Sequence, residues 1–273
     1  MHVGIIGGTG LAMMEALRDA ALQPVITPFG PALVRRAIIG DTRLSFIARH
    51  GIEGVVPPHR VNYRAHIAAL KALRVGSILA TAATGTLNPE MKPGELALLT
   101  QFIDLTKSRP TTFFDESKTQ PVHVDMSEPY CPRLRKNLGM SAEALGIKLH
   151  PRATYICTDG PRFETPAEIT AFQAWGADLV GMTNCPESSL AREAEICYAA
   201  VAVVTNYAAG ISPKPLSSAE VHEVMDKVRP TLEALFLRAI GKEERADCPC
   251  RHSLDGFPEE RARLWSLCHP EEK

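Results

Sequence analysis

Apolar positions along the chain follow two spacings, one typical of strands and one typical of helices. Short continuous or alternating apolar runs predict strands, and apolar residues three and four positions apart predict helices. Strands are expected at residues 2–6, 43–48, 77–82, 96–102, 152–157, 178–181 and 199–205, and helices at 62–75, 131–145, 166–175, 186–197 and 217–239. This alternation predicts an α/β fold, a single domain whose mixed central β-sheet is flanked by helices.

Two of the predicted helices also carry start signals. Pro186 stands at the first turn of one helix, where proline is favoured, and Ser217 with Glu220 predicts a capping box at the start of another. From Gly241 onward the composition turns charged and proline-containing. We therefore expect a domain over residues 1–240 and a charged C-terminal tail of unknown role over residues 241–273.

Composition and charge exclude several classes of protein. The 273 residues are 45% apolar and 22% charged, as is usual for globular chains. Thirty basic and 31 acidic side chains give a net charge of −1, which argues against a nucleic-acid partner. No apolar run approaches the roughly 18 residues of a membrane span, and the first residues lack the pattern of a signal peptide. We expect a soluble, cytoplasmic protein without a membrane or nucleic-acid partner.

The seven cysteines fit a reducing compartment. Four of them have no paired spacing and are expected to be reduced thiols: Cys131, Cys157, Cys185 and Cys197. The tail holds a group with the look of a metal-ligand cluster: Cys248, Cys250, His252, Cys268 and His269. A metal site needs four ligands held in fixed geometry. Because this segment is charged and weakly patterned, an ordinary tail is favoured and no metal is expected.

The first strand ends in the turn Gly7-Gly8-Thr9-Gly10, whose backbone N–H groups could approach an anion. Residue 13 is Met13, so the third glycine of a dinucleotide fingerprint is missing, and no Gly-Lys-Ser/Thr sequence of a Walker loop follows. A dinucleotide-dependent oxidoreductase is therefore disfavoured. By itself this segment is also compatible with an ordinary tight turn.

Chemistry-bearing side chains follow several other predicted strands. They occur in Arg49-His50, in TAATGT at 81–86, in DGPRFE at 159–164, in GMTN at 181–184 and in TNYA at 205–208. Arginine suits phosphate because its planar group donates two hydrogen bonds, and histidine can donate a third or transfer a proton. Ligands of open α/β sheets gather at such strand ends. These segments predict one pocket for an anion and a planar polar ligand, although solvated strand ends and turn chemistry remain open alternatives.

Several long motifs, taken together, resemble those of one known family. They are GIIGGTGL, RHG followed by PPHRVNYRAHI, QFIDLTKSRPTTFFD, MSEPYCP, DGPRFETPAE and GMTNCPESSLAREAEICYA. From residue 3 to about 240 the chain resembles the trimeric purine nucleoside phosphorylases and their methylthioadenosine phosphorylase branch. The resemblance implies phosphorolysis, in which inorganic phosphate is the co-substrate and no metal or other cofactor is needed. It also implies a homotrimer, with the segment 101–115 and His123 shared between neighbouring subunits.

The resemblance assigns roles to individual residues. The phosphate-binding group is implied to be Thr9, Arg49, His50, Ala83 and Thr183. Arg49 supplies charge and Ala83 its backbone N–H, while His50 and Asn206 are implied to take part in catalysis. Ala82 stands where the methylthioadenosine branch usually has a hydroxyl residue. One hydrogen bond to phosphate is therefore expected to be missing or to pass through water.

The base site departs from the methylthioadenosine branch. Phe163 resembles the aromatic wall beside the base and Met182 the residue under the sugar. Asn206 and Ala208 stand where that branch has two aspartates, and Glu164 where it usually has serine. An amide can pair with N7 and a 6-oxo group, and a carboxylate can accept N1–H, which adenine lacks. The pair favours 6-oxopurines, unless Glu164 instead caps the helix at 166.

The pocket for the 5′ end of the sugar is implied to contain His123, Ser218 and Val221, a mixture of polar and apolar groups. It could accept a hydroxymethyl or a methylthio group, so inosine, guanosine and methylthioinosine are all candidate substrates. Two alternatives remain: a methylthioadenosine phosphorylase, and a non-catalytic nucleoside sensor. The phosphate-binding residues argue against the sensor, which would have no use for phosphate.

Overall fold

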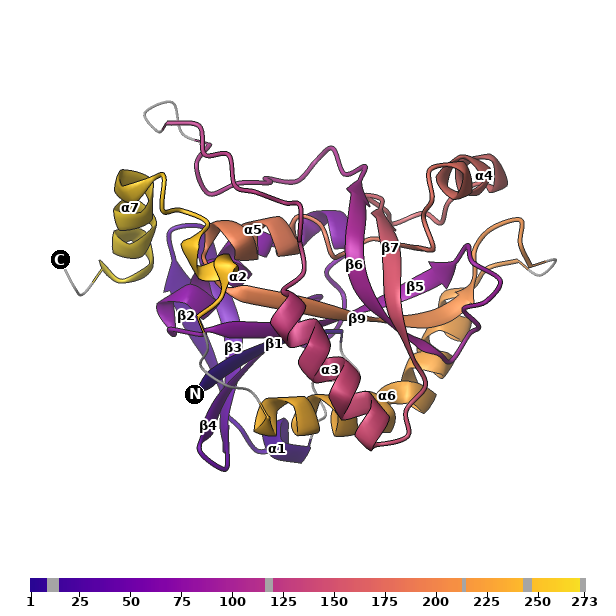
Figure 1. The fold of residues 1–273 in the computed structure, drawn as a ribbon, viewed down its shortest axis with the longest axis horizontal. Coiled ribbons are helices and arrows are strands. Elements are labelled where there is room, and N and C mark those ends of the chain that lie inside the picture. The colour runs from indigo at the N-terminus through magenta and orange to yellow at the C-terminus, as the bar shows by residue number, and fades with distance from the viewer. Residues whose placement is uncertain (9–14, 116–119, 213–214, 243–246, 271–273) are drawn as a thin grey trace.

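A nine-stranded mixed sheet with helices on both faces forms the centre of the computed structural model (Figure 1). The structure describes residues 1–8, 15–115, 120–212, 215–242 and 247–270. The strands are β1 (His2–Gly7), β2 (Leu22–Thr27), β3 (Gly30–Ile39), β4 (Thr42–Ala48), β5 (Ser77–Thr86), β6 (Leu96–Asp104), β7 (Leu149–Cys157), β8 (Leu179–Gly181) and β9 (Cys197–Tyr207). The predicted α/β architecture with a mixed central sheet is confirmed.

The strand pairing closes part of the sheet on itself. The strand order is β2-β3-β4-β1-β5-β8-β7-β6-β9, and β5 also pairs with β9, so strands β5 to β9 form a ring. The pairing of β5 with β9 shifts between Thr84 and Gly85, where Thr205 is one extra residue of β9. Such a bulge redirects the side chains that follow it. Here the residue that follows is Asn206.

Helices cover the sheet from both sides. They are α1 (Glu15–Arg18), α2 (Tyr63–Ala72), α3 (Pro132–Ala144), α4 (Pro166–Ala174), α5 (Glu187–Glu193), α6 (Ser218–Gly241) and α7 (Pro258–Cys268). One buried apolar cluster includes Leu138 of α3 and Phe236 of α6, and a second includes Ile67 of α2 and Leu190 of α5. In Figure 1 these two helix pairs lie on opposite sides of the strands. Each cluster is the apolar core between one face of the sheet and the helices that cover that face.

Some elements differ from the sequence-based expectation. The helix predicted over 186–197 is shorter, because Glu195 adopts a positive φ of 57° that ends the helix and β9 begins at Cys197. The hairpin of β2 and β3 was not predicted. Burial alternates along β3, where Val34 is buried and Leu33 beside it is exposed, but both residues are apolar, so the sequence does not show this alternation.

The chain beyond residue 240 packs onto the domain instead of extending as a separate tail. Its helix α7 contacts α2, and Glu260, Leu264 and Cys268 are buried on one side of it. These residues are four positions apart, the spacing of one helix face. The surrounding charged residues conceal this face in the sequence, so the expected end of compact structure near residue 240 was placed too early.

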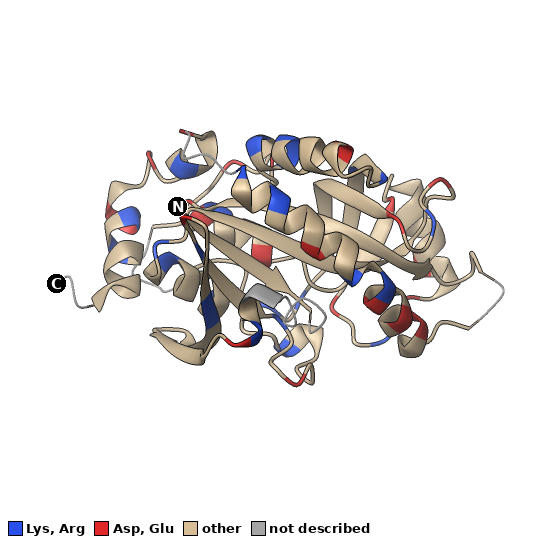
Figure 2. Ribbon diagram, turned by 90° about the horizontal axis from the view of Figure 1, so that it is seen from below, with Lys and Arg blue, Asp and Glu red and all other residues tan. Residues whose placement is uncertain are grey.

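Charged residues are spread over the described part of the chain. Figure 2 shows basic and acidic positions interspersed over the helices and loops of the described chain. Within the described residues, no helix combines the length and the apolar character needed to cross a membrane.

Candidate active site

A cavity of about 330 Å³ lies between the ends of several strands and the first turns of α6. This volume is within the usual range for small-molecule sites. Ten of the residues proposed from sequence line it: Arg49, His50, Ala83, Phe163, Glu164, Met182, Thr183, Asn206, Ser218 and Val221. Segments up to about 170 residues apart in the sequence therefore meet in one place, as the strand-end pattern predicts.

The outcome differs for three other residues named in the sequence analysis, which are Thr9, His123 and Ala82. Thr9 lies outside the described residues, although its neighbour Gly8 lines the cavity. His123 is exposed on an extended segment and is not part of the cavity wall of its own chain. Ala82 is buried in the apolar core, and successive strand residues face opposite sides, so Ala83 faces the cavity in its place.

Arg49 is held in the cavity wall by a buried ion pair. Its Nε and Nη2 atoms donate to the two carboxylate oxygens of Glu187, each at 2.8 Å, and Nη1 donates to the Thr81 carbonyl at 2.8 Å. Burial alone would lower the pKa of Arg49, but the charge of Glu187 raises it above its ordinary value. The guanidinium therefore stays charged. Among contacts of the described residues it uses three of its five N–H groups, which leaves one on each terminal nitrogen for an anion.

Glu187 was missed by sequence reasoning. It is fully buried at the start of α5 and also accepts a hydrogen bond of 2.6 Å from the Tyr198 hydroxyl. A buried arginine at a strand end needs a counter-charge, and the lone acidic residue opening the short helix 187–193 was the available signal. Nothing in the spacing of residues 49 and 187 indicates that they meet.

His50 is held in one tautomer. Its Nδ1 atom lies 2.8 Å from the carbonyl oxygen of Val56, which can only accept, so Nδ1 carries the hydrogen. Burial and the charge of Arg49 lower the pKa of His50. At neutral pH the ring is therefore uncharged and has a lone pair on Nε2. That nitrogen can accept a proton or a hydrogen bond from phosphate.

Glu164 belongs to the cavity and not to the cap of α4. The Thr165 hydroxyl accepts from the Glu168 backbone N–H at 3.2 Å, and Glu168 accepts from the Thr165 N–H at 2.8 Å, which completes the capping box without Glu164. Glu164 instead accepts a 2.8 Å hydrogen bond from the Thr158 hydroxyl. Burial raises the pKa of its carboxyl group, and the bond from Thr158 partly offsets this.

Asn206 is positioned by the bulge of β9 and by its neighbours. Its Oδ1 accepts from the Thr205 hydroxyl at 2.8 Å and its Nδ2 donates to the Tyr207 carbonyl at 2.9 Å. An amide has two N–H groups and two lone pairs, so one of each remains for a ligand. A Cβ at Gly85 would lie 3.2 Å from Nδ2, which explains why a glycine stands beside this amide.

The wall formed by α6 contains more residues than sequence reasoning proposed. In addition to Ser218 and Val221, the cavity is lined by His222, Met225 and Asp226. Residues 218, 222 and 226 are four positions apart, as are 221 and 225, so each set lies on one face of the helix. This periodicity was the signal that would have found them. Met182 lies on another wall, and a Cβ on Gly160 would collide with its sulfur.

Comparison with known proteins agrees with this geometry. The model of the Phosphorylase superfamily matches residues 2–241. The 6-oxopurine nucleoside phosphorylase of Pyrococcus furiosus is 48% identical, with 93% of this chain and 98% of that protein covered. A probable S-methyl-5′-thioinosine phosphorylase of Methanopyrus kandleri is 47% identical over the same shares.

Solved structures show the same likeness. The methylthioadenosine phosphorylase from Schistosoma mansoni in complex with adenine superimposes with a TM-score of 0.85, is 30% identical and is matched over 99% of both chains. The resemblance drawn from the sequence motifs is confirmed, and this chain belongs to the phosphorylase superfamily, in its purine nucleoside phosphorylase family.

Proposed function

We propose that this enzyme cleaves 6-oxopurine nucleosides by phosphorolysis. Inosine, guanosine or 5′-methylthioinosine reacts with phosphate and gives the free purine and ribose 1-phosphate, or its 5-modified equivalent. The observation that carries the proposal is the cavity itself, because Arg49 and His50 line it together with Glu164 and Asn206. The activities named for the relatives from Pyrococcus furiosus and Methanopyrus kandleri agree with this chemistry.

The reaction needs charge stabilisation at both ends of the breaking bond. The C1′–N9 bond breaks with its electron pair going to the purine, and a phosphate oxygen forms the new bond to C1′. Positive charge develops on the sugar and negative charge on the base, so bound phosphate acts both as nucleophile and as counter-charge. Arg49, His50, Thr183 and the Ala83 N–H hold phosphate, and Met182 packs against the sugar. The free N–H of Asn206 meets the charge that collects on N7 and O6.

Base selection follows from Glu164. Its carboxylate accepts the N1–H of a 6-oxopurine, whereas adenine presents a lone pair at N1, which would face the carboxylate without forming a hydrogen bond. A site built to pair with a substrate N–H rejects the analogue that lacks it strongly. Methylthioadenosine phosphorylase, the activity named for the Schistosoma mansoni structure, is the second candidate for this chain.

A substrate panel separates the candidates. At saturating phosphate, purine release from inosine, guanosine and methylthioinosine is expected to exceed release from methylthioadenosine by about 100-fold or more in kcat/KM. A preference for methylthioadenosine, with inosine and methylthioinosine inert, would overturn the 6-oxopurine assignment. Failure to release purine from any nucleoside would instead favour a non-catalytic nucleoside sensor.

The raised pKa of Glu164 predicts a pH dependence. As pH falls through this raised pKa, the carboxylate takes up a proton and no longer accepts N1–H, so the KM for inosine should rise at a higher pH than an ordinary glutamate would cause. Glu164→Gln removes the charge and should lower kcat/KM for inosine by about tenfold while abolishing this acid limb. The companion variant is Thr158→Val, which keeps the Glu164 carboxyl group but removes its hydrogen-bond donor.

Because the Thr158 hydroxyl lowers the pKa of Glu164, Thr158→Val should move the acid limb to higher pH and keep activity at alkaline pH. The measurement is the KM for inosine between acid and neutral pH in the three proteins. An acid limb that persists unchanged in Glu164→Gln would assign the titration to another group.

We also propose that the enzyme is a cytoplasmic homotrimer in which His123 completes the 5′ pocket of a neighbouring subunit. Support comes from the exposed position of His123 and from large exposed apolar side chains on the β2–β3 hairpin, where Ile26 and Ile38 are each 74% exposed. Light scattering should give the mass of a trimer. A monomer at micromolar concentration would contradict this proposal.

A further inference from the structure

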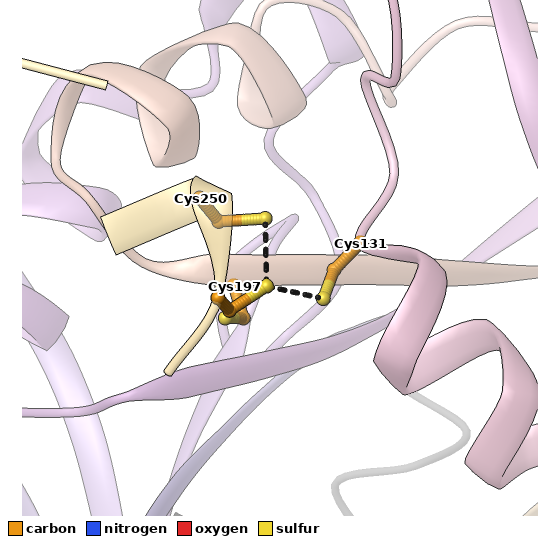
Figure 3. Close-up of side chains that lie close together, drawn as sticks. Cys131, Cys197 and Cys250 are labelled. Atoms are coloured by element: carbon orange, nitrogen blue, oxygen red, sulfur yellow. Dashed lines mark hydrogen bonds between the residues drawn. The ribbon is translucent and has the colours of Figure 1, made fainter. Parts of the chain in front are cut away.

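Four cysteines from three separate parts of the sequence lie together on the face of the sheet that carries α3 and α6. Cys131 precedes α3, Cys197 opens β9, and Cys248 and Cys250 flank Pro249 in the C-terminal segment. All four are buried, and their sulfur atoms lie within 4.8 Å of one another. Figure 3 shows Cys197 between Cys131 and Cys250. None of the four lines the cavity described above.

This grouping differs from the one considered in the sequence. Cys248 and Cys250 do belong to a cluster, but their companions are Cys131 and Cys197. His252 is exposed and pairs with Asp247 at 2.7 Å. Cys268 and His269 belong to the end of α7, where His269 stacks on Trp265. Because the last segment is charged and weakly patterned, the sequence alone did not indicate this cluster. Two of its four cysteines, Cys131 and Cys197, belong to the domain.

The distances fit a tetrahedral metal ion. With Zn–S bonds of about 2.3 Å, the sulfurs of a regular tetrahedron are about 3.8 Å apart. Cys131 and Cys248 are separated by 3.5 Å, and Cys248 and Cys250 by 3.6 Å. We propose that Cys131, Cys197, Cys248 and Cys250 form a closed four-thiolate site for a structural Zn²⁺ ion.

Zinc binds cysteine in its thiolate form. Cys131 stands at the N-terminus of the 13-residue helix α3, where the helix dipole stabilises negative charge. Binding converts four thiols to thiolates and releases their protons to solvent, without any change of oxidation state.

A closed site of this kind has a structural role. Four protein ligands leave no open position for substrate or water. The ion would join the start of α3, the start of β9 and the segment 248–250, and so hold the C-terminal segment against the domain. Loss of zinc should therefore lower thermal stability and expose the C-terminal segment to proteases, while kcat at temperatures well below melting stays unchanged.

The test begins with the unmodified protein, purified in a thiol reductant and dialysed against metal-free buffer. Elemental analysis should give about one zinc per chain. Cobalt exchanged into the protein should show the intense visible bands and thiolate charge-transfer bands of a tetrahedral four-sulfur site. A strong zinc chelator should remove the metal, lower the melting temperature and make the four thiols reactive.

Cys250→Ser should bind less than about one tenth of a zinc per chain, and Cys268→Ser is the matched control. Cys268 is also buried but lies outside the cluster, so that variant should keep its zinc. If Cys250→Ser does not fold, the metal content and cobalt spectrum of the unmodified protein still decide the question.

Two results would overturn the proposal. One is a protein without zinc that also fails to take up added Zn²⁺ or Co²⁺ under reducing conditions. The other is a native state in which the four cysteines form two disulfides, seen as a mass lower by four hydrogens and as four cysteines that label only after reduction. Neither result depends on the substrate of the enzyme, so a failure here is separate from a failure of the 6-oxopurine assignment.

Discussion

Arg49→Met is expected to lower kcat/KM for phosphate by about 10²–10³-fold at saturating inosine, the usual cost of removing a well-placed electrostatic donor. The two N–H groups of Arg49 that remain beyond its bonds to Glu187 and Thr81 are lost in this variant. In the unmodified protein, Glu187 and the Thr81 carbonyl fix the position of the Arg49 guanidinium. The measurement is hypoxanthine release as a function of phosphate concentration.

The same substitution should destabilise the fold, and a second variant separates the two effects. Removing one partner of a buried ion pair typically costs about 3–5 kcal/mol, because the other charge stays buried and unpaired. Arg49→Met combined with Glu187→Gln removes both charges of this buried pair. The double variant should therefore recover most of the free energy of unfolding in urea without recovering phosphate turnover. Near-normal use of phosphate by either protein would show that Arg49 does not bind it.

The sheet and most helices could be predicted because their signals are local. The apolar run at 199–205 identifies β9, and Ser217 marks the start of α6, where its hydroxyl accepts from the Glu220 N–H at 3.2 Å. The hairpin of β2 and β3 and the helix α7 were missed for opposite reasons. The hairpin exposes apolar residues such as Ile38, and α7 buries one face among charged neighbours.

The candidate site was predictable as far as it consists of strand ends. Arg49, Glu164 and Asn206 each follow or end a strand, and in the structure all three line one cavity. Glu187 was not predictable from spacing, because it meets Arg49 from 138 residues away. The four-cysteine cluster could not be predicted for the same reason, because Cys131 and Cys248 are separated by 117 residues. Partners brought together by folding leave no periodic signal in the sequence.

Asn206→Asp should change base preference from 6-oxopurines toward 6-aminopurines. The substitution removes the N–H that we propose faces N7 and O6, and an ionised carboxylate would repel O6. It also places the new oxygen beside the Tyr207 carbonyl, which now accepts from Nδ2 at 2.9 Å. This contact and burial should raise the pKa of the introduced carboxyl group. In its protonated form it can donate to N7 and accept from an adenine amino group.

The expected loss for inosine is about 2–4 kcal/mol of transition-state stabilisation, or roughly 30- to 1,000-fold in kcat/KM. Methylthioadenosine cleavage should improve only in part, because Ala208 supplies no second carboxylate. Asn206→Asp with Ala208→Asp should extend the change, and adding Glu164→Gln should weaken inosine further. The measurement is kcat/KM for inosine, methylthioinosine and methylthioadenosine in each variant. An Asn206→Asp enzyme that keeps the unmodified ratio of inosine to methylthioadenosine would show that this amide does not select the base.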